Sequence, residues 1–317
     1  MTRYLFNRLS HALIVLLAVS LAVFFVMYKA GDPVELLLPP DATQQQVAAM
    51  REHLGLNDPF FVQYGVFLRN ALRGDVGNSF IYGQPALRVV MERLPATLEL
   101  ATFAMLLAVG LGIPLGVIAS VKPGSAVSRG IMFFSLAGIS VPTFWMGMIL
   151  VLVFSVTWGL LPSSGRADMA PFSTFFSIEG LKYLILPGIT LCLFQLALIL
   201  RLTKSGMMEV LLQDYIKLAR AKGLPRHVVI LLHALKNTLI PVVTIIGIQF
   251  GELIAFTIVT ETIFAWPGTG KLIIDAIQNL DRPVVVAYLM VVAMIFVLIN
   301  LVVDVLYTFI DPRVHGR

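Results

Sequence analysis

The sequence contains few charged residues and a single cysteine. Only 13% of its 317 residues are charged, while 58% are hydrophobic. A soluble domain of this size would carry about 25% charged residues, so most of the surface of this chain faces something other than water. The lone cysteine, Cys192, excludes an internal disulfide and a cysteine-based metal cluster. Its apolar surroundings indicate a packing role.

Common signatures of enzymes are also missing. No His-Glu-x-x-His or Gly-x-Ser-x-Gly string occurs, which excludes the standard metalloprotease and serine hydrolase motifs. The five histidines are scattered without the spacing of metal ligands. Residues 268–271 look like part of a phosphate-binding loop, but Ala265 replaces the first glycine and Leu272 follows the lysine. We therefore expect no catalytic residue, no metal site and no cofactor in this chain.

Long apolar runs are what the sequence has in abundance. The runs that are long enough to span about 30 Å of hydrocarbon as helices are 9–28, 97–121, 131–158, 183–202, 239–260 and 284–308. The first run exceeds an ordinary signal-peptide core, and residues 27–30 make a poor cleavage site, so we expect it to stay as a span. The sequence predicts an all-α integral membrane protein with about six transmembrane helices.

Lysine and arginine predict the orientation of these spans. Segments 1–8, 121–130, 201–236 and 309–317 hold 13 of them in 63 residues, and segments 29–95, 160–183 and 262–283 hold 10 in 113 residues. Because positive residues favour the cytoplasmic side, both termini are expected in the cytoplasm. The net charge of +5 is thus explained by positioning against membrane lipid, without nucleic acid.

This orientation divides the chain into four parts. Residues 1–28 form the cytoplasmic N-terminus and the first span, and residues 29–95 form a periplasmic cap. Residues 96–308 form a transmembrane domain of five further helices, and residues 309–317 form a cytoplasmic tail.

The cap carries signals for two helices. Thr43 and Gln46 make a capping-box pattern, and Gly55 can end the helix that they open. Pro59 suits the first position of a second helix. Two interpretations are open for the cap: a cover over the outer mouth, or a docking surface for an extracytoplasmic partner.

Several glycines and prolines lie within or beside the predicted spans. The pairs Gly112–Gly116 and Gly247–Gly251 have the four-residue spacing that allows helices to approach closely. Prolines that sit in or beside spans, where they can kink a helix or pack between helices, are Pro114, Pro142 and Pro187.

The loop 201–236 is the longest predicted cytoplasmic loop and carries seven Lys or Arg residues. Asp214 is expected to cap a short helix over residues 215–222, and Gly223 to end it in the left-handed conformation. Pro225 suits the first turn of the next helix. The loop therefore reads as a helix, a glycine break and a second helix.

Two interpretations of the short helix follow from its residues. It is either part of a solvated basic loop or a helix that enters a groove on another protein. The small side chains of Ala219 and Ala221, beside the break at Gly223, favour the second interpretation because they allow close approach.

Residues 214–224, Asp-Tyr-Ile-Lys-Leu-Ala-Arg-Ala-Lys-Gly-Leu, resemble the cytoplasmic coupling loop of permeases in dipeptide, oligopeptide and nickel ABC importers. The general importer motif is Glu-Ala-Ala, three residues, Gly, nine residues, then Ile-x-Leu-Pro. Ala219, Gly223 and Leu235 match it, whereas Lys217 and Lys236 stand at the Glu and Pro positions. Further strings that resemble the family follow in order at 31–33, 53–56, 74–79, 93–98, 233–237, 264–268, 300–304 and 311–313.

The resemblance implies a function. The chain would be the pore-forming permease subunit of an ATP-driven, binding-protein-dependent importer of di- or oligopeptides in the bacterial inner membrane. Its partners would be a homologous second permease subunit, two cytoplasmic ATPase subunits that hold ATP and Mg²⁺, and a periplasmic or lipid-anchored substrate-binding protein. The residues that would couple it to the ATPases are Asp214, Tyr215, Lys217, Ala219, Arg220, Ala221 and Gly223.

Ionisable residues within spans are candidate functional residues, because burying charge in lipid is costly and such residues are kept mainly where they have a role. Glu252 lies about midway along the fifth span, with Gln249 on a compatible face. Either they form a polar contact between helices, or they line a translocation pathway and meet a peptide amine or another cation. Glu99 and Glu261 fall near span ends, where we expect them to reach the interface.

Two rival functions stay open. A secondary transporter or channel would need no ATPase and would show internal repeats with broken helices; no clear repeat is visible. An intramembrane hydrolase would require the carboxylates of Glu252 and Asp304 to meet in one cavity.

Overall fold

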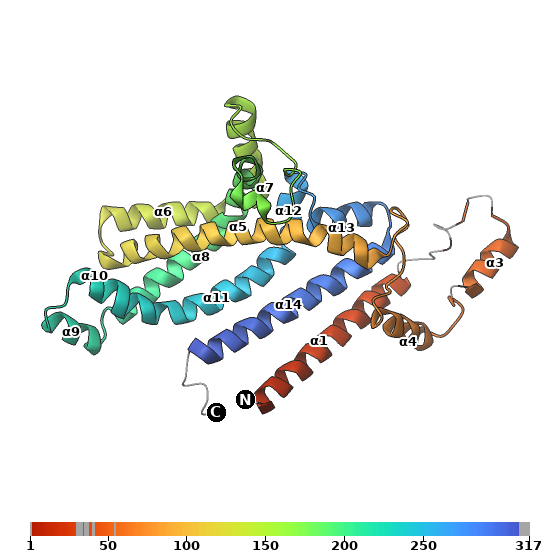
Figure 1. The fold of residues 1–317 in the computed structure, drawn as a ribbon, viewed down its shortest axis with the longest axis horizontal. Helices are drawn as coiled ribbons and strands as arrows, with labels where there is room; N and C mark the ends of the chain where they lie inside the picture. The colour runs from red at the N-terminus through yellow and green to blue at the C-terminus, as the bar shows by residue number, and fades with distance from the viewer. Residues whose placement is uncertain (1, 30–33, 35–37, 40–41, 54, 311–317) are drawn as a thin grey trace. The chain divides into compact units, whose positions relative to one another are not determined.

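The computed structural model describes residues 2–29, 34, 38–39, 42–53 and 55–310, which fold into helices joined by loops (Figure 1). Within these residues, extended pairing is confined to one isolated bridge between Asn78 and Pro85, so the all-α prediction is confirmed for the described chain. The chain divides into two units, Met1–Leu94 with Leu272–Val297 and Pro95–Lys271 with Leu298–Arg317. The family-like strings at 31–33 and 311–313 lie outside the described residues.

The helices follow one another along the chain. They are α1 (Thr2–Lys29), α3 (Gln44–His53), α4 (Phe60–Ala71), α5 (Ala86–Val121), α6 (Ala126–Ser140), α7 (Thr143–Leu150), the π-helix η1 (Val151–Thr157), the 3₁₀-helix η2 (Ser173–Phe176), α8 (Ile178–Val210), α9 (Asp214–Ala221), α10 (Arg226–Val228), the π-helix η3 (Val229–Leu235), α11 (Lys236–Ala255), α12 (Ile258–Ile263), α13 (Thr269–Gln278) and α14 (Arg282–Ile310).

Helices long and apolar enough to cross a membrane account for four of the predicted spans. They are Ala86–Val121, Ile178–Val210, Arg226–Ala255 and Arg282–Val303, and α6 with α7–η1 passes the same test as a bent pair. The described residues thus hold four to five long apolar helices. The first predicted span falls on α1, whose apolar stretch Leu13–Val26 is shorter, so the count of six stays a prediction.

The predicted third span is not one continuous helix. α6 and α7–η1 meet at a bend of 103°, because Val141 is extended (φ −90°, ψ 125°) and Pro142 precedes the first residue of α7. The proline ring excludes its predecessor from the helical region and offers no N–H to continue the ladder. Pro114 and Pro187, in contrast, lie inside α5 and α8 without ending them.

Glycines allow the helices of the second unit to pack closely. A Cβ on Gly116 of α5 would stand 2.7 Å from the Thr203 Cβ and 2.8 Å from the Leu200 carbonyl oxygen, both in α8. A Cβ on Gly247 of α11 would likewise collide with Val303 of α14. The close approach predicted from the glycine spacing is therefore confirmed at these two contacts.

Two predictions about helix ends in residues 29–95 are confirmed in the first unit. The Thr43 N–H donates to the Gln46 Oε1 at 2.8 Å and the Gln46 N–H donates to the Thr43 Oγ1 at 3.3 Å, which is a capping box. Gly55 follows α3 in the left-handed region at φ +65°. Pro59 is the residue before α4 and not its first helical residue, a correction of one position.

A buried carboxylate fastens two loops of the first unit. Asp281, before α14, is fully buried. It accepts hydrogen bonds from the Ser79 hydroxyl, from the Phe80 N–H at 3.2 Å and from the Ile81 N–H at 3.4 Å. The Ser79 Oγ in turn accepts from the Tyr82 N–H at 2.9 Å. This single side chain therefore holds the loop between α4 and α5 against the start of α14.

We expect Asp281→Ala to destabilise the chain by about 3 kcal/mol, because it leaves buried donors without an acceptor. Thermal melting of the purified protein in detergent measures the change. Asp168→Ala is the matched control, since Asp168 is exposed. Equal melting temperatures for the two variants would contradict the fastening role of Asp281.

Candidate functional site

The candidate site centres on α9, which the structure anchors to its own chain. Ile216 is fully buried and Ala219 is 8% exposed. Both belong to a cluster with Met207 of α8 and with Val229 and Ala234 of η3. The small side chain of Ala219 thus fills a place inside this chain. We call these five residues the α9 anchor.

The N-terminus of α9 differs from the prediction by one residue. Asp214 is the first helical residue, and Gln213 before it makes no side-chain capping bond. The Asp214 Oδ1 accepts from the Lys217 Nζ at 2.8 Å, and both side chains are exposed. Asp214 still places a negative charge in the first turn, where the helix dipole favours it. Its assignment as the capping residue is nevertheless wrong, because the extended residue before the helix is Gln213 (φ −67°, ψ 150°).

The C-terminus of α9 is a complete Schellman motif. The Gly223 N–H donates to the Arg220 carbonyl at 3.0 Å and the Leu224 N–H donates to the Ala219 carbonyl at 3.3 Å. Gly223 has φ +75°, and a Cβ built there would meet no atom within 4 Å. Glycine is therefore required for its backbone conformation and not for lack of space. The predicted glycine stop is confirmed.

The opposite face of α9 is exposed and both apolar and basic. Tyr215 and Leu218 are 43% and 57% exposed, and Arg220, Ala221 and Lys217 are exposed with them. We call these five residues the α9 outer face. Tyrosine and arginine, both present on this face, are among the residues that are enriched in protein interfaces.

One hydrogen bond joins this face to α11. The Asn237 Nδ2 of α11 donates to the Tyr215 hydroxyl at 2.7 Å and to the His233 carbonyl at 3.1 Å.

Pro225 precedes α10 and is not its first helical residue. From Arg226 the helix then runs to Ala255 as one apolar segment, so α9 connects directly with a candidate span.

Gln249 and Glu252 lie in α11, three residues apart, which places them on neighbouring positions of one helix face. Both are partly buried. The Gln249 Oε1 is buried without a hydrogen-bond partner among the described residues. Gln195 of α8, which sequence reasoning missed, has a buried Oε1 in the same condition. The side chain of Asp304 lies outside the described part, so no meeting with Glu252 is shown.

Glu99 does not reach the membrane interface as expected. It is fully buried in α5, and its Oε2 accepts from the Arg166 Nη2 at 2.7 Å and Nε at 2.9 Å. The Arg166 guanidinium also donates to the Met169 carbonyl at 3.2 Å and lies 6.0 Å from the Trp266 ring centroid. The loop between η1 and η2 supplies this partner 67 residues away, which no local pattern signals.

Glu261, in the first turn of α12, is also fully buried, so the expectation that it reaches the interface is wrong. Its Oε1 accepts from the Thr97 hydroxyl at 2.7 Å and its Oε2 from the Lys271 N–H at 2.9 Å. The Thr97 Oγ1 itself accepts from the Thr269 N–H at 2.8 Å. Burial raises the pKa of the Glu261 carboxyl, and the hydrogen bonds from Thr97 and the Lys271 N–H oppose that shift.

The glycine-rich segment 268–271 wraps around this carboxylate. A Cβ on Gly268 would collide with the Glu261 carboxylate, and one on Gly270 would stand 2.8 Å from the Ile258 Cα. Trp266, fully buried, donates from Nε1 to the Ala96 carbonyl at 2.9 Å. The segment that looked like a phosphate loop therefore encloses a carboxylate of its own chain.

Gly268→Ala is expected to lower stability by about 2 kcal/mol, because the added methyl displaces a carboxylate that has nowhere to move. Melting of the purified protein is the measurement. Gly110→Ala is the control, since a Cβ at Gly110 meets nothing within 4 Å and alanine favours the helix. A Gly268→Ala variant as stable as the control would refute the enclosure.

Comparisons with known proteins cover nearly the whole chain. Residues 112–316 match the family model described as "Binding-protein-dependent transport system inner membrane component", and residues 1–101 match the model of the N-terminal part of such a membrane component. The chain is 40% identical over 331 residues to the dipeptide transport system permease protein of Alkalihalophilus pseudofirmus, with 99% of each chain covered. It is 39% identical over 318 residues to the oligopeptide transport system permease protein of Bacillus subtilis, with 99% of this chain and 100% of the relative covered.

Solved structures add a likeness of fold. The inward-facing MetNI methionine ABC transporter aligns with 72% of this chain and 98% of its own, with a TM-score of 0.54 and 15% sequence identity. At that identity the likeness concerns the fold alone. The fold that the two chains share is an all-helical membrane architecture.

Proposed function

Because the chain belongs to the family of binding-protein-dependent transport system inner membrane components, we propose that it is the permease subunit of an ATP-driven importer of di- or oligopeptides. The full-length similarity to dipeptide and oligopeptide permeases carries this proposal. The chain itself has no catalytic role. ATP and Mg²⁺ belong to partner ATPase subunits.

The complete importer contains a second, homologous permease subunit that forms a heterodimeric pore with this one. Two ATPases bind on the cytoplasmic side, and a periplasmic or lipid-anchored binding protein delivers the substrate. Both termini of this chain are cytoplasmic, and α1 is the first of six spans. The excess of Lys and Arg in segments 1–8, 121–130, 201–236 and 309–317 supports this orientation.

The α9 outer face docks into a groove on an ATPase. Tyr215 and Leu218 offer exposed apolar contacts, and the surrounding cations steer the approach of an acidic surface. Ile216 and Ala219, on the other face of α9, pack against α8 and η3. When ATP binding closes the ATPases, a push on α9 therefore passes to the helices that continue into two candidate spans. Peptide shifts this equilibrium only through different affinities for the two states.

Gln249 and Glu252 are proposed to line the translocation pathway. The partnerless Gln249 Oε1 and the partly buried Glu252 of α11 support this role, since polar groups in a span are retained where they meet water or substrate. Glu252 would face the amine of a passing peptide.

Leu218→Asp should weaken ATPase binding about tenfold or more, because it sets an unpaired charge at the centre of an apolar contact. Uptake of labelled dipeptide into proteoliposomes and co-purification of the ATPases measure the effect. Leu72→Asp is the control, since Leu72 is 82% exposed and distant in sequence. Normal uptake in Leu218→Asp would remove the docking role, and uptake without ATPases would favour a secondary transporter.

A bulky residue at Gly223 or Ala219 is expected to uncouple ATP hydrolysis from transport. At Gly223 the cause is strain at φ +75°, and at Ala219 it is overpacking of the α9 anchor. ATPase activity measured beside uptake in the same preparation tests this. Coupled, wild-type transport in a well-expressed Gly223→Val variant would contradict it.

Glu252→Gln is expected to slow uptake by roughly tenfold, because it removes a charged acceptor for the peptide amine. Transport rates for several peptides provide the measurement, with Glu209→Gln at an exposed position as the control. An unchanged rate and unchanged specificity would assign Glu252 to helix packing.

A further inference from the structure

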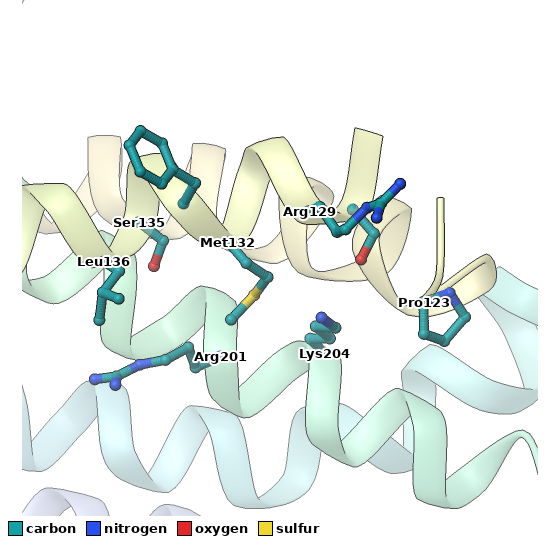
Figure 2. A pocket seen from close by; sticks show the side chains of 9 residues that line it. Pro123, Arg129, Met132, Ser135, Leu136, Arg201 and Lys204 are labelled. Atoms are coloured by element: carbon teal, nitrogen blue, oxygen red, sulfur yellow. The ribbon is translucent and has the colours of Figure 1, made fainter. Parts of the chain in front are cut away.

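A pocket of about 380 Å³ lies between α6 and α8. Arg129, Met132 and Leu136 of α6 line it, and their spacing of three and four residues puts them on one helix face. Arg201 and Lys204, also three residues apart, line it from α8. Figure 2 shows Met132 and Ser135 between the two helices, with Arg201 and Lys204 on the α8 side.

The charges of this pocket all have one sign. Arg129, Arg201 and Lys204 line it without any acidic residue. The ion pairs that the described residues form do not include any of the three. Like charges held around one pocket repel one another unless an anion lies between them.

A buried hydroxyl adds a hydrogen-bond donor. Ser135 lines the pocket and is 4% exposed, and its Oγ has no hydrogen-bond partner among the described residues. Because buried hydroxyls are normally paired, the Ser135 Oγ is suited to a ligand atom that accepts a hydrogen bond.

The pocket changes from basic to apolar along both helices. Arg129 is near the start of α6, which begins at Ala126, and Leu136 lies about 10 Å further along the axis at 1.5 Å per residue. On α8, a second pocket of about 440 Å³ joins Lys204 and Arg201 to Leu198, deeper in the helix. Phe133 and Leu136 are 68% and 59% exposed, so apolar surface is open beside the charges.

We propose that this pocket binds an anionic phospholipid. The phosphate lies among Arg129, Arg201 and Lys204 and accepts a hydrogen bond from Ser135. The acyl chains follow Phe133, Leu136 and Leu198 toward the middle of the bilayer. Basic pockets between spans on the cytoplasmic side are suited to anionic head groups, so the choice of leaflet rests on the orientation given under Proposed function.

The order of polar and apolar surface favours a lipid over other occupants. A free anion would use the three cations and make no contact with the exposed apolar side chains beside them. A peptide carboxylate or an acidic residue of a second permease subunit would account for the charges alone. Only an amphipathic anion matches the charged end and the apolar end of the same groove.

The test uses the transporter complex that contains the full chain, purified in detergent. Mass spectrometry measures retained phosphatidylglycerol in the wild type, in the double variant Arg201→Gln/Lys204→Gln and in Lys236→Gln, a control at an exposed cation of α11. Each charge removed from the pocket is expected to weaken retention about fivefold. The control is expected to retain lipid as the wild type does.

Thermal melting gives a second measurement. Added phosphatidylglycerol is expected to raise the melting temperature of the wild type, whereas phosphatidylcholine and inorganic phosphate leave it unchanged. Ser135→Ala should melt like the wild type without added lipid but show a smaller shift with phosphatidylglycerol. Neither measurement requires transport, so a failure to import peptides would count against the proposed function alone.

Three outcomes would overturn the proposal. Equal retention of phosphatidylglycerol by the double variant and the control would remove the cations from lipid binding. An equal melting shift with inorganic phosphate would point to a free anion. Loss of the second permease subunit from the double variant would identify the groove as a contact between subunits.

Discussion

The hydrocarbon interior of a membrane offers no hydrogen bonds, and the rest of this structure depends on that constraint. Backbone groups must be paired within the chain, which requires helices. Wherever a helix ends or a charge is buried, the chain has to supply the partner itself. The carboxylates of Glu261 and Asp281 meet this requirement through side chains or backbone N–H groups of their own unit. Glu99 meets it through Oε2, which pairs with Arg166, while its Oε1 has no partner among the described residues.

Features set by neighbouring residues could be predicted from the sequence. The capping box at Thr43 and Gln46 and the left-handed stop at Gly223 depend on a few adjacent positions. Apolar runs located the long helices for the same reason. The order of the apolar runs placed the α9 loop between the fourth and fifth of them. Residues 214–224 of this loop resemble a coupling loop in their own sequence.

Features set by distant residues could not be predicted. Glu99 pairs with Arg166 and Glu261 with Thr97 across 67 and 164 residues, so their burial had no local signal. The direction of Ala219 depends on Met207 and Val229, which meet only in the fold. The break at Pro142 was visible as a proline, but whether a proline ends a helix depends on its surroundings, as the uninterrupted helix at Pro187 shows.

The bend after Ser140 has a consequence for how the protein is made. α6 has 15 residues and is about 22 Å long at 1.5 Å per residue, shorter than the roughly 30 Å hydrocarbon layer. The elbow leaves backbone groups that need protein partners, and α8, packed against both α6 and α7, is made only later. The contacts of α8 with both sides of the elbow therefore form only after α8 has been synthesised.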